Sequence, residues 1–321
     1  MRIAFVYTGI AGYMTDCWRA LGALPGVELR VWLEDMKDYR YKGNRDEVLQ
    51  GIDIRWKYSE DITEPWLEKV EMEIESFKPD VALVCGWSRR LPPFVAKADK
   101  LRNIPMVLDF DMPWERSFRK ILARFVLARR SRRFSAAFVP GASTARYARW
   151  LGFTRDMIFE GRNCIDVSKF RNGMGNRDGF LFIGRHVKEK GLDILEKGYE
   201  LYKKRGGKWG LTVPDFIEPT DVPSLMWKHS CLILPSRWEP WGVVVLEAMA
   251  AGMNTIVSDR VGARLDLPVD EVFKSGDSAG LAEAMLRIEK AGASSKKVDL
   301  SKYSVESWAN RVLEICERCR K

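Results

Sequence analysis

The sequence predicts an α/β protein made of two lobes, each built around a parallel β-sheet. Short apolar runs alternate with segments of helical periodicity along most of the 321 residues, which is the pattern of successive βαβ units. Several of these runs, such as VALVC at 81–85, are apolar throughout, as strands buried on both faces of a parallel sheet are. The length also fits two domains, at roughly 100–200 residues per domain.

The first lobe is expected over residues 1–168. Its elements are predicted from apolar runs for strands and from apolar residues that recur every three to four positions for helices. The expected strands are residues 2–7, 27–33, 52–56, 81–85, 106–110, 136–139 and 157–159, and the expected helices are about residues 13–24, 64–77, 91–101, 114–133 and 143–151.

A polar stretch with three glycines, KFRNGMGNRDG at 169–179, is predicted to link the lobes. The second lobe is expected over residues 180–300, and a closing helix within 301–321 is expected to pack back on the first lobe. The second lobe should contain strands at 179–183, 209–213, 231–234 and 255–258, and helices at 191–205, 223–229, 243–251 and 279–290. The alternation predicts two Rossmann-like lobes that face a central cleft with the carboxyl ends of their strands.

Composition excludes several classes of protein. Hydrophobic residues make up 46% of the chain, which is enough apolar surface to build cores and excludes intrinsic disorder for most of the chain. No apolar run approaches the ~20 residues of a membrane-spanning helix, and the first residues lack the pattern of a signal peptide. The six cysteines are scattered, which is typical of a reduced, cytoplasmic protein rather than a disulfide framework.

The net charge of +9 is concentrated in one segment. Residues 116–155 contain eleven Lys and Arg and no acidic residue, whereas the remaining chain has 42 basic and 44 acidic residues. Such a segment is either a solvated basic face or a surface that attracts anions, including an anionic membrane. No nucleic-acid-binding motif surrounds it, so nucleic acid is not an expected partner.

The most informative stretch is PSRWEPWGVVVLEAMAAGMNTIVS at 235–258. Glu239 follows a predicted strand, a helix begins near Val243, and Glu247 lies about one turn inside that helix. A helix N-terminus suits a diphosphate because it offers free backbone N–H groups and a partial positive charge. Ionised carboxylates suit hydroxyl-rich ligands because each accepts two hydrogen bonds at once.

A second cluster is FIGRHVKEKGLDIL at 182–195. A predicted strand ends at Gly184, Arg185 follows it, and Lys190 precedes the next helix. Arg contacts phosphate in a bidentate manner and Lys supplies a mobile point charge. From these residues alone, a phosphate site and a solvated basic loop are equally good interpretations.

Together with WKHSCLILPSRWEPWG at 227–242 and NCIDVSKF at 163–170, these segments resemble glycosyltransferase family 4. This family comprises retaining transferases of the GT-B fold, and Glu239 and Glu247 have the spacing of its E-x7-E motif. The resemblance extends over about residues 160–260 and is weak in the first lobe. The second lobe is short between Lys208 and Pro223, where relatives help to hold the nucleotide base, so the chain resembles a short variant.

The resemblance implies transfer of a sugar, with retention, from a nucleotide sugar to a glycan or a lipid-linked acceptor, as in polysaccharide biosynthesis. Glu239 would contact the donor sugar, while Arg185 and Lys190 would neutralise the leaving diphosphate. The other implied donor-binding residues are Glu247, which would hold the ribose hydroxyls, and Gly184, Trp241, Gly242, Val243 and Val244. The resemblance implies no cofactor and no metal, because Arg and Lys take the metal's place.

In the first lobe, the resemblance implies a cleft lined by Gly9, Gly12, Trp87, Asp109 and Asp111. Many relatives have a His there, but the only histidines of this chain are His186 and His229 in the second lobe. Asp109 or Asp111 is the expected polar substitute.

A second function stays open, that of a nucleotide-sugar or glycan binding module with little or no turnover. It is suggested by the absence of that His and by the short segment between Lys208 and Pro223, where relatives help to hold the nucleotide base. A nucleotide-sugar epimerase is disfavoured by the E-x7-E spacing. The expected location is the cytoplasm, either free or peripherally bound to the inner face of the membrane through the basic segment.

Overall fold

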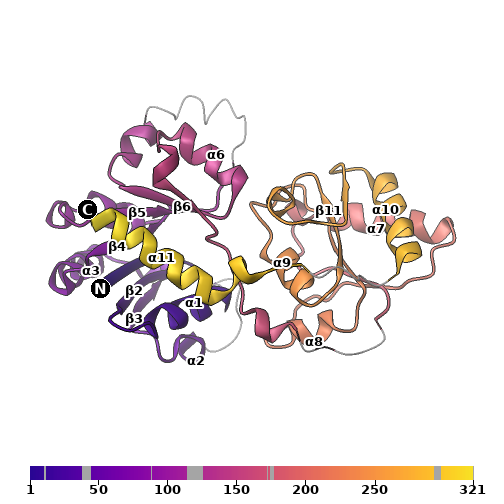
Figure 1. The fold of residues 1–321 in the computed structure, drawn as a ribbon, viewed down its shortest axis with the longest axis horizontal. Coiled ribbons are helices and arrows are strands. Elements are labelled where there is room, and N and C mark those ends of the chain that lie inside the picture. The colour runs from indigo at the N-terminus through magenta and orange to yellow at the C-terminus, as the bar shows by residue number, and fades with distance from the viewer. Residues whose placement is uncertain are drawn as a thin grey trace. The chain divides into compact units, whose positions relative to one another are not determined.

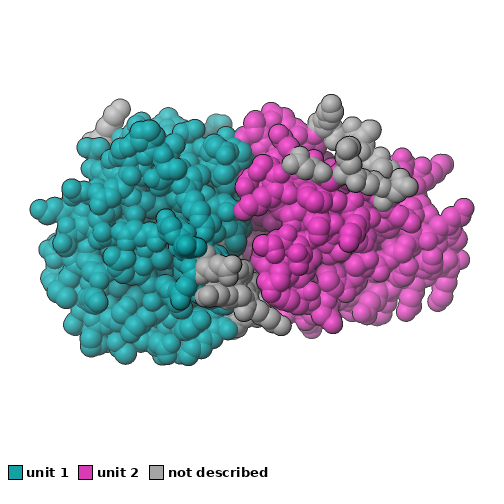
Figure 2. Space-filling view, turned by 90° about the horizontal axis from the view of Figure 1, so that it is seen from below, with its two compact units in different colours: residues 1–164, 302–321 teal, residues 165–301 magenta. Residues whose placement is uncertain are grey.

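The computed structural model describes residues 1–10, 12–37, 45–87, 89–113, 126–171, 173, 177–292 and 298–320. The chain divides into two compact units, residues 1–164 together with 302–321, and residues 165–301 (Figure 2). The stretch 169–179, predicted to be a linker, falls within the second unit. Residues 172 and 174–176 of that stretch, and residues 114–125 of the helix expected at 114–133, lie outside the described residues.

The first unit contains a parallel sheet with helices on both faces (Figure 1). Across the described residues the sheet has seven strands in the order β3-β2-β1-β4-β5-β6-β7. The strands are β1 (Arg2–Thr8), β2 (Glu28–Asp35), β3 (Ile54–Tyr58), β4 (Val81–Cys85), β5 (Met106–Asp109), β6 (Ala136–Val139) and β7 (Ile158–Glu160).

The helices of this unit form two layers. The labelled helices are α1 (Gly12–Gly22), α2 (Arg45–Leu49), α3 (Glu64–Phe77), α4 (Leu91–Lys97), α6 (Ala142–Trp150) and α11 (Val305–Arg320), and residues 126–131 are also helical. Helices α1 and α11 lie beside each other on one face of the sheet, whereas α3, α4 and α6 pack on the other (Figure 1).

The interior of strand β1 is apolar because both faces of the strand are covered. Ile3 and Phe5 pack in the core under α1 and α11, while Ala4 and Val6 pack in the core under α3 and α4. Successive side chains of a strand point to opposite faces, so a strand covered on both sides must be apolar at every position.

The second unit contains a smaller parallel sheet. Its described strands run in the order β12-β11-β10-β8-β9, and α7 and α10 pack together over one face. The elements are β8 (Phe180–Leu181), α7 (Leu192–Lys204), β9 (Leu211–Thr212), α8 (Val222–Met226), β10 (Cys231–Leu234), α9 (Val243–Ala250), β11 (Asn254–Ser258), β12 (Glu271–Phe273) and α10 (Ser278–Ala291).

Short 3-10 helices complete the two units. They span Ser59–Asp61, Asp99–Leu101, Arg155–Met157, Val167–Lys169, Lys188–Lys190, Gly262–Leu265 and Ser301–Tyr303. No helix among the described residues combines the length and apolarity needed to cross a bilayer.

The predicted α/β class with parallel sheets is confirmed, and most expected elements are present. Strand β12 was not predicted, and the helix expected at 91–101 ends at Lys97. The helix is interrupted because Ala98 adopts an extended conformation, with φ −62° and ψ 121°, before the short 3-10 helix at Asp99–Leu101.

Candidate functional site

The second unit brings two of the predicted segments together. The ammonium group of Lys190, at the end of a 3-10 helix after β8, forms an ion pair with the carboxylate of Glu239, in the loop after β10. The two side chains are only 17% and 11% exposed. Because little water screens such a pair, its attraction is stronger than that of an exposed pair.

Arg237 links these two loops through hydrogen bonds. Its guanidinium group donates two hydrogen bonds of 2.6 Å to the carboxylate of Asp193, at the start of α7. Its backbone N–H donates to the carbonyl oxygen of Glu189 at 2.7 Å. Arg237 was not predicted as a site residue, because a single Arg in a loop carries no signal of a partner 44 positions away.

Two glycines allow the loop that contains Lys190 and the loop that contains Glu239 to lie close together. Gly191 has φ +71°, and a Cβ atom there would lie 2.4 Å from the carbonyl oxygen of Pro235. Gly242, with φ +99°, directly precedes α9, and a Cβ atom there would lie 3.2 Å from Cγ of Glu239 and from Cδ2 of Leu234. A side chain at either position would strain the backbone and push the two loops apart.

Helix α9 supplies the remaining groups of the constellation. The amides of Val243 and Val244 lie in its first turn, where backbone N–H groups have no acceptor within the helix. Glu247 lies one turn further on and is partly buried. Burial raises the pKa of Glu247 to about 7, so its protonation changes near neutral pH.

The other predicted donor residues differ in exposure. Arg185, directly after Gly184, is exposed. Trp241 is 2% exposed and its indole N–H donates to Asp266 at 2.8 Å, so its ring is a packed part of the loop rather than an open stacking surface. Trp238, 41% exposed, is the accessible aromatic residue of this loop.

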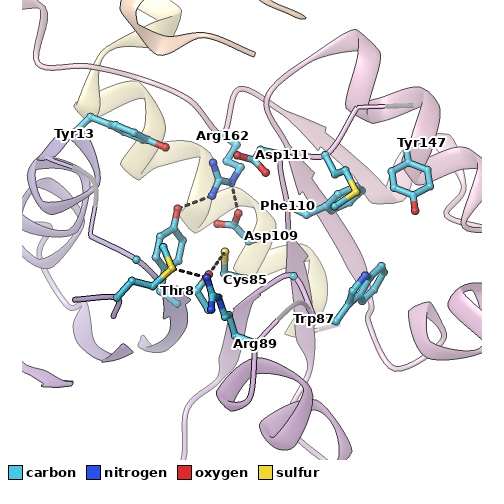
Figure 3. A pocket seen from close by; sticks show the side chains of 15 residues that line it. Thr8, Tyr13, Cys85, Trp87, Arg89, Asp109, Phe110, Asp111, Tyr147 and Arg162 are labelled. Carbon is cyan, nitrogen blue, oxygen red and sulfur yellow. Dashed lines mark hydrogen bonds and ion pairs between the residues drawn. The ribbon is translucent and has the colours of Figure 1, made fainter. Parts of the chain in front are cut away.

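The first unit has a separate cavity of about 240 Å³ at the carboxyl ends of β1, β4 and β5 (Figure 3). Parallel α/β sheets bind ligands at this edge. The lining residues are Tyr7, Thr8, Gly9, Tyr13, Met36, Cys85, Gly86, Trp87, Arg89, Asp109, Phe110, Asp111, Met112, Tyr147 and Arg162.

A buried ion pair forms one wall of this cavity. The guanidinium group of Arg162 pairs with Asp109 and donates to the hydroxyl of Tyr7 (Figure 3). It also donates to the side-chain oxygen of Asn163. Asp109 is fully buried, and its Oδ2 atom has no hydrogen-bond partner among the described residues. Burial raises the pKa of Asp109, and the Arg162 charge opposes that shift.

The phenol and thiol groups that line the cavity stay neutral at pH 7. Burial raises the pKa of Tyr13 and that of Cys85 to about 12. The cavity therefore presents aromatic rings and phenolic hydroxyls beside carboxylates. Aromatic faces, hydroxyl donors and carboxylate acceptors are the groups that contact a hydroxylated ligand such as a saccharide.

Four of the five residues predicted for the first lobe line this cavity, namely Gly9, Trp87, Asp109 and Asp111. Gly12 instead begins α1 and is not one of the lining residues. Arg162 was missed, although it directly precedes the NCIDVSKF segment. The described residues contain no group of three or more His, Cys, Asp or Glu side chains arranged to hold a metal ion.

Comparison with known sequences points to one family for part of the chain. The family model described as glycosyl transferases group 1 matches residues 198–305, which contain Glu239 and Glu247. The mannosylfructose-phosphate synthase of Agrobacterium fabrum (strain C58 / ATCC 33970) is 26% identical over 141 residues. That match spans 37% of this chain and about a third of the relative, 31% of its length.

Solved structures of similar fold align with nearly the whole chain. The apo form of the lipopolysaccharide outer core galactosyltransferase WaaB superposes with a TM-score of 0.68 at 13% identity, over 99% of both chains. The protein Alr3699/HepE of Anabaena, in complex with UDP and glucose, gives a TM-score of 0.68 at 15% identity, over 99% of this chain and 98% of that one. Likeness at this level of identity establishes the architecture. The chain thus has the α/β fold of GT-B glycosyltransferases, with two Rossmann-like units, and its residues 198–305 are similar to glycosyl transferases group 1.

Proposed function

We propose that this protein is a retaining glycosyltransferase that uses a nucleotide-sugar donor. The observation that carries the proposal is the shielded Lys190–Glu239 pair, set against the Gly242 turn at the start of α9. A cation, a carboxylate and a helix N-terminus side by side are suited to a sugar joined to a diphosphate. Two of the groups, Glu239 and the start of α9, lie in the segment that matches the family model.

Each donor residue has a role in this proposal. Lys190 and Arg185 neutralise the diphosphate as it leaves, and the amides of Val243 and Val244 add hydrogen bonds to it. Glu239 accepts hydrogen bonds from the sugar hydroxyls. Glu247, when ionised, accepts from the ribose hydroxyls. These groups stabilise the charge on the leaving diphosphate and fix the orientation of the sugar. Charge stabilisation and orientation supply most of the rate enhancement in this proposal.

The reaction proposed is a substitution on one face of the sugar. The bond between C1 and the phosphate oxygen breaks, and a bond forms between C1 and an acceptor hydroxyl oxygen on the same face. The acceptor proton goes to the departing phosphate oxygen, so the step needs no protein base. We expect it to need no metal either, because cationic side chains carry the charge.

The nucleotide is proposed to be UDP. The Anabaena structure, which this chain resembles in fold, is a complex with UDP and glucose. The cavity of the first unit is proposed to hold the acceptor, a saccharide or a lipid-linked sugar of polysaccharide biosynthesis. The proposed location is the cytoplasm, with peripheral attachment to the inner face of an anionic membrane.

The test begins with binding. Thermal unfolding is measured with UDP, UDP-glucose, other nucleoside diphosphates and their sugars, because a ligand at 100 times its dissociation constant stabilises the folded protein by about 2.7 kcal/mol. Release of free sugar from the stabilising nucleotide sugar is then followed by NMR. Stabilisation with no hydrolysis and no transfer to any acceptor would instead identify a binding module, and no stabilisation by any of them would refute the proposal.

A further inference from the structure

The first unit has a second, smaller cavity of about 120 Å³. Its lining residues all lie in described parts of the chain: Gly86, Trp87, Pro93, Ala96, Lys97, Arg129, Arg130, Arg133 and Phe134. Gly86 and Trp87 also line the larger cavity proposed for the acceptor. The two cavities are therefore neighbours that share one wall.

That shared wall is aromatic. The centroid of the Trp87 indole ring lies 6.5 Å from that of the Phe110 ring and 6.4 Å from that of the Phe134 ring. Phe110 lines the larger cavity and Phe134 the smaller one. With Pro93 and Ala96, the rings of Trp87 and Phe134 give the smaller cavity an apolar floor, which favours an apolar ligand group over water.

The rest of the lining is cationic, and no acidic residue contributes to it. Arg133 is held in place, because its guanidinium group donates to the carbonyl oxygens of Leu101 at 2.7 Å and Ile104 at 3.2 Å. Burial lowers the pKa of Arg133, and the nearby charge of Arg102 lowers it further. A bound anion would relieve that unfavourable environment.

The remaining cations are available to a ligand. Lys97, Arg129 and Arg130 are exposed, and none of them forms an ion pair with another described residue. Several unpaired cations at the mouth of an apolar cavity are complementary to a molecule with an anionic head and an apolar body.

We propose that this cavity binds a lipid phosphate, with the chain on the floor formed by Trp87, Ala96 and Phe134 and the phosphate between Arg129 and Arg130. Free inorganic phosphate would leave the apolar floor unused. A nucleic acid would need a row of aromatic residues for successive bases, whereas this cavity is a single small pit. Since the larger cavity adjoins it at Trp87, the acceptor is a sugar carried on a phosphate-bearing lipid; this last step rests on the proposed function.

Calorimetric titration with three probes tests the site without any need for catalysis. The probes are octyl phosphate, inorganic phosphate and octyltrimethylammonium, each below its micelle concentration. Octyl phosphate should bind at least tenfold more tightly than either of the others. Equally tight binding of inorganic phosphate would reduce the cavity to a simple anion site, and equally tight binding of the cation would remove the role of the arginines; either result overturns the proposal.

Variants then locate the binding. The double variant Arg129→Gln/Arg130→Gln should weaken octyl phosphate binding at least tenfold, which corresponds to about 1.4 kcal/mol. Arg146→Gln/Arg149→Gln is the matched control, because it removes the same charge from exposed positions of α6 that do not line the cavity. Its affinity should change less than twofold. Equal losses in the two double variants would show bulk attraction alone and overturn the proposal.

The apolar half is tested by Ala96→Phe, which fills the floor of the cavity from α4. It should abolish octyl phosphate binding while the unfolding temperature and UDP binding remain those of the wild type. If Ala96→Phe binds octyl phosphate normally, the chain does not lie in this cavity and the proposal fails. If octyl phosphate behaves as expected but UDP does not bind the wild type, the donor proposal fails and the lipid site stands.

Discussion

Glu239 and Lys190 were predicted from separate segments, and the fold joins them in one shielded pair. We expect Glu239→Ala to lower sugar transfer by ~10²–10³, by analogy with the loss of one well-placed polar group from an active site. The fold should survive, because the carboxylate lies in a loop and not in a core. Transfer rates and thermal unfolding of Glu239→Ala are compared with those of Glu196→Ala, an exposed change on α7. Wild-type turnover in Glu239→Ala would refute the role of its carboxylate at the donor sugar.

We expect donor binding to depend on pH through Glu247. Its pKa is about 7, so the ionised form that accepts hydrogen bonds from ribose accumulates as the pH rises through 7. Affinity for uridine, which does not itself titrate in this range, should therefore increase from pH 6 to pH 8. Calorimetry at both values should show this increase in the wild type and not in Glu247→Gln. An unchanged slope in Glu247→Gln would assign the titration to another group.

The same residue predicts the sign of a stability effect. The folded protein favours the protonated carboxyl, because its pKa of about 7 lies above the ordinary value of 4.5. Stability should thus fall as the pH rises from 4.5 to about 7, and Glu247→Gln should reduce that fall.

Residues in patterned segments were predicted from the sequence, whereas residues that are fixed by distant partners were missed. Glu239 and Glu247 were found from their spacing on one loop and one helix. Arg162 and Arg237 were missed because Asp109 and Asp193, which fix their places, lie 53 and 44 positions away.

Among the elements, the start of α9 depends on one backbone position. The backbone of Gly242 lies in the left-handed region, and the absence of a side chain there leaves room for Glu239. We expect Gly242→Ala to cost about 1–2 kcal/mol in the free energy of unfolding and to weaken nucleotide-sugar binding, because the new Cβ atom displaces Glu239. Chemical denaturation and calorimetry measure the two effects.

Gly252 provides the control, since it follows the same helix with φ +74° and the atoms nearest to its added Cβ atom would be those of the flexible end of Arg177. Gly252→Ala should lower stability similarly and leave binding unchanged. If both variants bind the nucleotide sugar normally, the Gly242 turn has no part in the donor site.

Among the strands, those buried on both faces were predicted best. Strands β4, β6 and β10 match their expected limits because an apolar run is the whole signal of such a strand. Strand β8 pairs over only Phe180–Leu181 within the apolar run 179–183, and β12 was missed. The residues at which a strand begins and ends depend on its hydrogen bonds to neighbouring strands. The local sequence pattern does not contain that information.

For the whole molecule, the concentrated charge predicts reversible binding to anionic bilayers. Basic residues near such a surface contribute about 1 kcal/mol each, and salt weakens the attraction. The variant with Arg129, Arg130 and Arg132 changed to Glu should lose co-sedimentation with anionic vesicles. Arg133 is left unchanged, because it holds the carbonyl groups of Leu101 and Ile104.

A variant with Lys197, Lys204 and Lys274 changed to Glu alters the net charge equally on the other unit and should still co-sediment. Equal binding to neutral and anionic vesicles would mean that the basic face is solvated surface, and a water-soluble acceptor would then be favoured.

The path of the chain also has a consequence for synthesis. Trp308 of α11 is fully buried in the first unit, 5.9 Å from the ring of Phe5 and 6.1 Å from that of Phe138. A ribosome makes the strands of this unit early and must then make all of residues 165–301 before it reaches Trp308. Until then the first unit has a hydrophobic face uncovered. Of the two units, the one whose strands are made first therefore cannot finish folding before the second has been synthesised, and its uncovered face is open to non-native association during that interval.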